Sequence, residues 1–73
     1  EAGEMRGQLR HALNKLDPKY RELVVLRDLE GLSYEEVAQI SGIEMKLVKS
    51  RLYQARQILA AKMKRYFEEA SYV

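Results

Sequence analysis

"GLSYEEVAQISGIEMKLVKSRLYQAR", residues 31–56, is the stretch that decides the fold. It contains two helix-like segments that meet at Gly42 with almost no linker, and Gly42 can adopt the positive φ that a three-residue turn requires. Ala38 is small enough for close approach of the two segments, and Val48 is placed to fill the angle between them. The spacing predicts a helix-turn-helix, a motif whose second helix enters the major groove of DNA. An ordinary helical hairpin with the same glycine is the alternative.

Capping residues mark the boundaries of the helices around this motif. Ser33 with Glu36 forms a capping box, Asp17 and Pro18 suit the start of an earlier helix, and Gly31 suits its left-handed end. The chain has no alternating run typical of a strand. We therefore predict an all-α fold in a single helix-turn-helix domain spanning 1–73, with a long C-terminal recognition helix. The four expected helices are about 3–15, 18–30, 33–41 and 44–68.

Apolar residues recur at helical spacing and predict which face of each helix is buried. The second helix is apolar around most of its circumference, so we expect it to be central. The expected inward residues are Met5, Leu9, Ala12, Leu13 and Leu16; Tyr20, Leu23, Val24, Val25, Leu26 and Leu29; Val37, Ala38 and Ile40; and Met45, Val48, Leu52, Ala55, Leu59 and Met63.

Composition argues against an enzyme. The 73 residues include no cysteine and one histidine, His11, so they offer no disulfide framework, no thiolate zinc site and no catalytic set. Acidic residues such as Asp28 and Glu35 are accounted for by helix caps and exposed faces. We expect no metal, no cofactor and no small-molecule substrate.

Hydropathy bears on the location of the chain. No run approaches the ~18 apolar residues of a membrane span, and the charged start does not resemble a signal peptide. We expect a cytoplasmic domain that does not bind membranes. Because the chain starts at Glu1 without methionine, it is expected to be a piece of a longer or processed protein, and its tail after Ala70 is expected to fray.

Charge is concentrated in the last expected helix. Residues 44–65 carry seven Lys or Arg against one Glu, whereas residues 1–43 carry six Lys or Arg against eight Asp or Glu. A basic element on a near-neutral body is typical of a protein that binds a polyanion. A solvated helix face is the alternative from charge alone.

The helical phase of this element predicts which side chains face DNA. With the apolar line inward, Arg51 and Arg56 lie on the flanks, where phosphates would be. The mixture on the outward side suits base edges, since Lys matches guanine, Gln matches adenine, and an aromatic ring fits the thymine methyl. The outward residues are Lys46, Lys49, Ser50, Tyr53, Gln54 and Gln57.

Two motifs, "RDLEGLSYEEVA" and "VKSRLYQAR", resemble region 4 of the sigma-70 family of bacterial sigma factors, most closely its extracytoplasmic-function group. The resemblance runs from about Leu9 to Leu59. It implies recognition of the −35 promoter element and docking on the β-flap of core RNA polymerase to direct transcription initiation. An anti-sigma factor is a further implied partner.

The resemblance also assigns residue roles. It implies that Lys49, Ser50, Tyr53 and Gln54 face bases, while Tyr34, Arg51 and Arg56 lie near the sugar-phosphate backbone. Lys46 stands where the family usually has glycine, and its charge is expected to supply a backbone contact. For partner docking we expect the apolar side of the first two helices, near Leu23 and Leu26.

Two other readings remain open at this point. The near all-round apolar second helix also fits a protein-interaction module that an anti-sigma factor binds. The second of these readings is a stand-alone regulator with a sigma-like helix-turn-helix. Gln54, where the family often has Arg, affects the promoter sequence that would be read rather than the fold.

Overall fold

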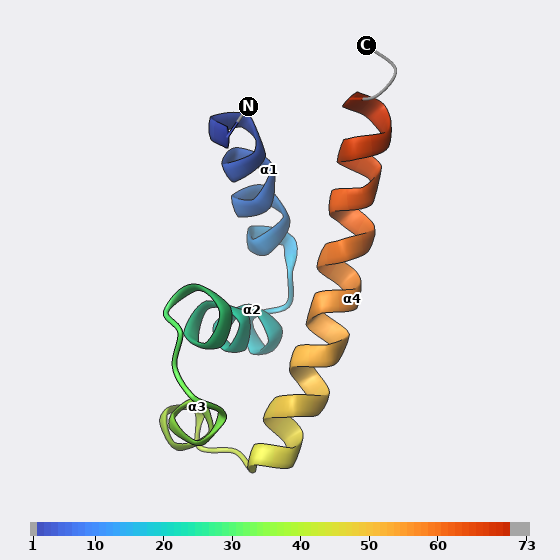
Figure 1. The fold of residues 1–73 in the computed structure, drawn as a ribbon. Coiled ribbons are helices and arrows are strands. Elements are labelled where there is room, and N and C mark those ends of the chain that lie inside the picture. Colours follow the sequence, from blue (N-terminus) through green and yellow to red (C-terminus); the bar gives the residue numbers. More distant parts are fainter. Residues whose placement is uncertain (1, 71–73) are drawn as a thin grey trace.

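The computed structural model describes residues 2–70, and the side chains of residues 3–65. Within this part of the chain the fold consists of helices only: α1 (Ala2–Lys15), α2 (Pro18–Val24), α3 (Tyr34–Ser41) and α4 (Met45–Ala70) (Figure 1). The predicted all-α fold with a long last helix is confirmed. The expected fraying after Ala70 lies outside the described residues.

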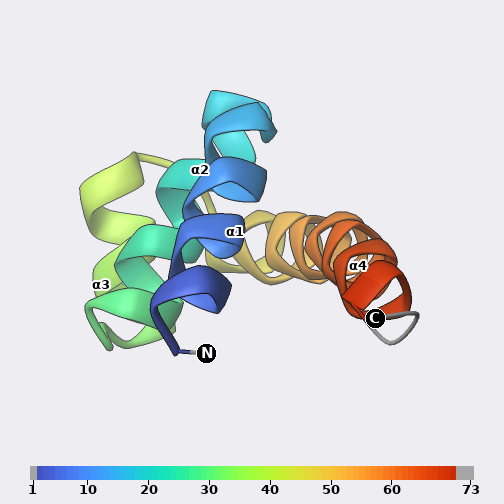
Figure 2. The same cartoon turned by 90° about the horizontal axis from the view of Figure 1, so that it is seen from above.

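Three helices gather on one side of the fourth. Figure 1 shows α4 running the length of the molecule, with α1, α2 and α3 stacked beside it, and Figure 2 shows the same arrangement from above. The molecule is therefore elongated, with principal extents of 44 × 20 × 16 Å. None of the helices in the described residues carries an apolar stretch able to cross a lipid bilayer.

The second helix departs from the expected regular α-helix to residue 30. After Val24 it continues as a π-helical turn, η1 (Val25–Leu29), in which the Glu30 N–H donates to the Val25 carbonyl, five residues back, at 2.9 Å. An extra residue per turn rotates the following side chains relative to an α-helix. Such turns are frequent at functional sites.

The caps around the turns form as the sequence predicts. The Glu36 N–H donates to Ser33 Oγ at 3.1 Å, and the Ser33 N–H donates to Glu36 Oε1 at 2.9 Å, which completes the capping box. Gly31 and Gly42 have φ of 77° and 71°. Both glycines thus supply the left-handed residue that ends the preceding helix.

The core lies between α4 and the other three helices, and it includes most of the expected inward residues. Val37 and Val48 are fully buried and belong to the two helices of the motif, so the predicted role of Val48 is confirmed. The buried set is Ala12, Leu13, Leu16, Leu23, Val24, Val37, Val48, Leu52, Ala55 and Leu59.

Four residues expected in the core are instead exposed. Ile40 is 61% exposed because α3 has only two turns and directs its other side, including half-buried Ser41, toward the core. Leu29 is 57% exposed at the end of the π-helical turn. Met5 and Met45 lie in the first turns of α1 and α4, where few neighbours cover them.

Candidate nucleic-acid interface

The predicted helix-turn-helix consists of α3, the turn at Gly42, and the first turns of α4. The Gly42 N–H and the Ile43 N–H both donate to the Ala38 carbonyl, at 2.9 and 3.2 Å, so the turn is closed by backbone bonds. Burial of Val48 and Leu52 fixes the rotation of α4 about its axis. The opposite side of α4 is consequently free to meet a ligand.

That free side carries the residues that the sequence assigned to DNA bases. Lys49, Ser50, Tyr53 and Gln54 are all exposed, Tyr53 by 66%, as is Lys46. Arg51 is half-buried on the flank. These positions agree with the helical phase inferred from the sequence, while the contacts of each residue with DNA stay predictions.

Tyr34, at the start of α3, gathers cations from two other elements. The Arg27 guanidinium carbon lies 4.5 Å from the centre of its ring and Lys49 Nζ lies 5.3 Å from it, which are cation–π distances. Hydrogen bonding to Arg56 and then to Arg27 holds the pKa of the Tyr34 phenol below its usual value. Three of these residues, Tyr34, Lys49 and Arg56, were assigned to DNA from the sequence.

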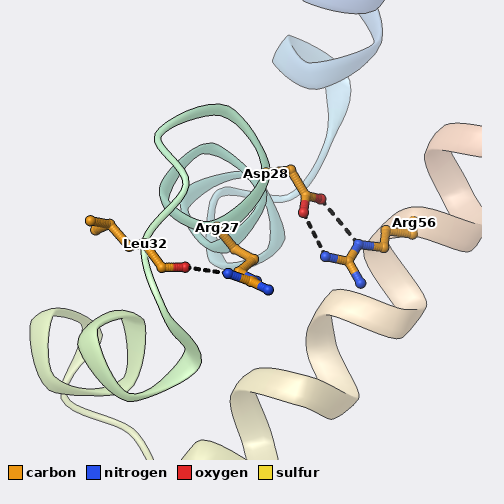
Figure 3. A network of polar contacts seen from close by, with 4 residues as sticks. All are labelled: Arg27, Asp28, Leu32 and Arg56. Atoms are coloured by element: carbon orange, nitrogen blue, oxygen red, sulfur yellow. Dashed lines mark hydrogen bonds and ion pairs between the residues drawn. The ribbon is translucent and has the colours of Figure 1, made fainter.

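Arg56 has a partner that the sequence did not reveal. Its Nε and Nη2 donate to the two carboxylate oxygens of Asp28, at 3.0 and 2.5 Å, across the gap between η1 and α4 (Figure 3). The contact with Asp28 raises the pKa of Arg56 above its ordinary value. Asp28 was expected to serve only a helix cap or a solvated face, so its role is corrected.

Arg27, next to Asp28, was also missed. Its Nη1 donates to the Leu32 carbonyl at 2.7 Å, which holds the guanidinium beside the Tyr34 ring (Figure 3). Both side chains project from the π-helical turn, and Asp28 lies 28 residues before its partner. Neither local spacing nor a capping signal indicates such a pairing.

Gln54 is likewise tied to another helix. Tyr20 Oη, from α2, donates to Gln54 Oε1 at 2.7 Å. This bond fixes the orientation of the amide and uses one of the two lone pairs of its oxygen, while both N–H donors of the NH₂ remain for a ligand. Tyr20 was expected to serve the core alone, and it is half-buried with its hydroxyl at this contact.

The predicted partner surface needs correction at Leu23, while the assignment of Leu26 stays a prediction. Leu23 is 1% exposed, so a partner cannot touch its side chain without unfolding α2, and Leu26 is half-buried against the core. An accessible groove lies instead between α1 and the second half of α4. Its lining combines two apolar and several polar or basic side chains: Gln8, His11, Ala12, Lys15, Lys62, Met63 and Arg65.

Neither surface resembles a metal site. In the part of the chain that the structure describes, no three His, Cys, Asp or Glu side chains come together as metal ligands would. The arrangement presents hydrogen-bond donors and positive charge on one helix, which suits binding to a polyanion.

Comparisons with known proteins place these features in a family context. A family model described as "Sigma-70, region 4" matches residues 6–59. The chain is 40% identical over 63 residues (86% of its length) to the ECF RNA polymerase sigma factor SigE of Mycolicibacterium smegmatis, covering 24% of that protein. It is 39% identical over 51 residues (70%) to the RNA polymerase sigma factor SigV of Bacillus subtilis, covering 31%, and 38% identical over 61 residues (84%) to YlaC, a sigma factor of the same bacterium, covering 35%.

Proposed function

We propose, since this chain belongs to the sigma-70 region 4 family and is related to its extracytoplasmic-function group, that it recognises the −35 promoter element for RNA polymerase. The family is a DNA-binding, non-enzymatic one. The chain spans about a quarter to a third of the relatives that it matches. Promoter recognition within a larger sigma factor is therefore our proposal for the part described here.

One observation carries this proposal: the outward face of α4 is polar and basic while its inward face is buried. A helix about 10–12 Å across fits the major groove, which is about 12 Å wide. Burial of Val48 and Leu52 leaves Lys49 and Tyr53 exposed on the outward side of α4, with Lys49 Nζ 5.3 Å from the centre of the Tyr34 ring. In this arrangement Lys49, Ser50, Tyr53 and Gln54 read base edges.

Phosphate contacts come from the flanks of the same helix. Arg51 lies on one side of the outward face and Arg56 on the other, beside Tyr34 at the start of α3. Lys46 adds a charge in the first turn of α4. These four residues fix the register of the domain on the duplex, because contacts with phosphates position a protein without reading the base sequence of the DNA.

Mutants separate the two kinds of contact. Lys49→Ala is expected to cost about 1–3 kcal/mol on the cognate duplex and to relax preference at one or two positions. Arg51→Ala is expected to weaken all duplexes equally and to reduce the salt slope by about one unit. Lys64→Ala, which removes a charge from an exposed site farther along α4, is the matched control.

Fluorescence anisotropy with a set of single-base variants, at two salt concentrations, measures both quantities. Uniform weakening of every duplex by Lys49→Ala would show that this residue does not read bases. A change of base preference in Lys64→Ala would show that any lost charge on α4 has that effect.

For docking on the β-flap of RNA polymerase, the groove between α1 and α4 is a better candidate than Leu23. It is accessible, it has Ala12 and Met63 in its lining, and it lies beyond the DNA-reading turns of α4. A polymerase subunit is the partner class that the names of the relatives indicate. Binding of an anti-sigma factor, which the sequence implied for the apolar side of the first two helices, stays a prediction.

A two-surface test follows from this geometry. Met63→Glu is expected to abolish capture by an isolated flap fragment while leaving binding to duplex DNA intact. Lys49→Ala combined with Tyr53→Ala is expected to do the reverse. Thermal melting of both variants controls for folding, and loss of flap capture in the Lys49/Tyr53 variant would contradict two separate surfaces.

A further inference from the structure

Asp28 lies at the proposed DNA-binding surface although it carries the same sign of charge as DNA. Both of its carboxylate oxygens accept hydrogen bonds from Arg56, at 3.0 and 2.5 Å. The Asp28 side chain is 35% exposed and that of Arg56 is 45% exposed, so the pair lies at the surface and not in the core. A cation assigned to the phosphate backbone is thus already neutralised within the domain.

The π-helical turn holds Asp28 in this position. Arg27 and Asp28 are consecutive residues of η1, and Arg27 is engaged by the Leu32 carbonyl and the Tyr34 ring (Figure 3). With Arg27 fixed on one side, Asp28 is directed across the gap to α4. The carboxylate is therefore built into the site.

We propose, resting on the function proposed above, that Asp28 is a counter-ion that lowers the affinity of the domain for duplex DNA of every sequence without affecting base preference. A guanidinium has five N–H donors. Asp28 uses two of those of Arg56, and the rest are shared between the Tyr34 hydroxyl and a phosphate. Arg56 can still position the duplex, but the neutral pair releases no counter-ion from DNA and so contributes little net electrostatic affinity.

A weakened contact has a functional consequence. When the domain alone binds duplexes loosely, stable occupancy requires a second attachment that raises its effective concentration at the DNA. The counter-ion thus makes promoter binding depend on the remainder of the assembly.

Charge-balanced variants test this role. Asp28→Asn keeps the size of the side chain and one acceptor oxygen for Arg56, and it leaves the guanidinium charge uncompensated. We expect affinity for any duplex to rise about three- to tenfold, with a salt slope steeper by up to about 0.9. Arg56→Gln is expected to lower affinity by a similar factor, and the double variant is expected to return close to wild type.

Glu30→Gln is the matched control. Glu30 is an exposed residue two positions after Asp28, so this change also removes one negative charge. Anisotropy titrations of all variants use a fluorescein-labelled duplex of arbitrary sequence and a second duplex of scrambled order. Circular dichroism melting checks that each variant is folded. We expect little change in stability, because an exposed ion pair contributes little to it.

Each outcome decides the proposal. Tighter binding by Asp28→Asn on both duplexes, with Glu30→Gln near wild type, supports it. Unchanged or weaker binding by Asp28→Asn, or a double variant as weak as Arg56→Gln, shows that Asp28 only positions Arg56 and overturns the proposal. An equal gain from Glu30→Gln overturns it too, since any acidic residue would then act alike. If neither wild type nor Asp28→Asn binds either duplex at low salt, where contacts with phosphates are strongest, the domain does not bind duplex DNA and the proposed function itself fails.

Discussion

Replacing Val48 with Asp is expected to unfold the domain, because Val48 is fully buried between the two helices of the motif. Removing the buried apolar side chain costs about 1.5–3 kcal/mol. An uncompensated buried charge costs about 3–5 kcal/mol more. A chain of 73 residues is stable by only about 4–11 kcal/mol in total. The combined cost is thus comparable to the whole free energy of unfolding.

Ile40→Asp is the matched control for this substitution. Ile40 belongs to the same motif, and its side chain is 61% exposed, so the same introduced charge stays in water. The expected cost is less than about 1 kcal/mol, including the unfavourable placement of an acidic residue near the end of α3.

Thermal and urea unfolding, followed by circular dichroism at 222 nm, a wavelength that reports helix, measure both variants. We expect Val48→Asp to lose its cooperative transition and Ile40→Asp to keep it near the wild-type midpoint. A wild-type transition in Val48→Asp would mean that α4 is rotated about its axis from the orientation described here. Equal destabilisation by the two variants would contradict the exposure of Ile40.

Three further predictions concern the turn, the cap and the tyrosine contact. Gly42→Ala is expected to destabilise the fold by about 1–2 kcal/mol in urea titrations. An added Cβ would meet no atom within 4 Å, so this cost comes only from the left-handed backbone. Gly7→Ala, inside α1, is expected to stabilise the fold by about 0.5–1 kcal/mol. The Ser33 backbone N–H and then the Ser33 hydroxyl hold the pKa of Glu36 below its ordinary value. The resulting stabilisation is present above the ordinary carboxyl pKa and is lost as pH falls through the lowered folded value; melting as a function of pH should show this step in wild type but not in Glu36→Gln. Tyr20→Phe is expected to change base preference only at the position that Gln54 contacts, as binding to single-base variants would reveal, and a uniform change would contradict this coupling.

Local signals in the sequence were sufficient to predict the helices and the turn. Capping at Ser33 and left-handed ends at Gly31 and Gly42 depend on residues within a few positions of one another, and each forms as predicted. The rotation of α4 was also predictable, because its apolar line repeats over several turns and averages out single exceptions such as Met45.

Features that depend on tertiary packing were not predictable. With only two turns, α3 has too few apolar positions to fix its rotation, so Ile40 was misplaced. The π-helical turn leaves no pattern in the sequence, and the Asp28–Arg56 pair that it positions joins residues far apart in the chain. Leu23 was expected both to face inward and to lie near a partner surface, because an all-round apolar α2 does not indicate which of its faces the other helices cover.

Selection of bound sequences from a random duplex library tests the central claim most directly. We expect wild type to enrich one short motif, Lys49→Ala to alter that motif at one or two positions, and Arg51→Ala to retain it with lower overall recovery. Enrichment of no motif by wild type, or an unchanged motif in Lys49→Ala together with an altered one in Arg51→Ala, would contradict base reading by the outward face of α4.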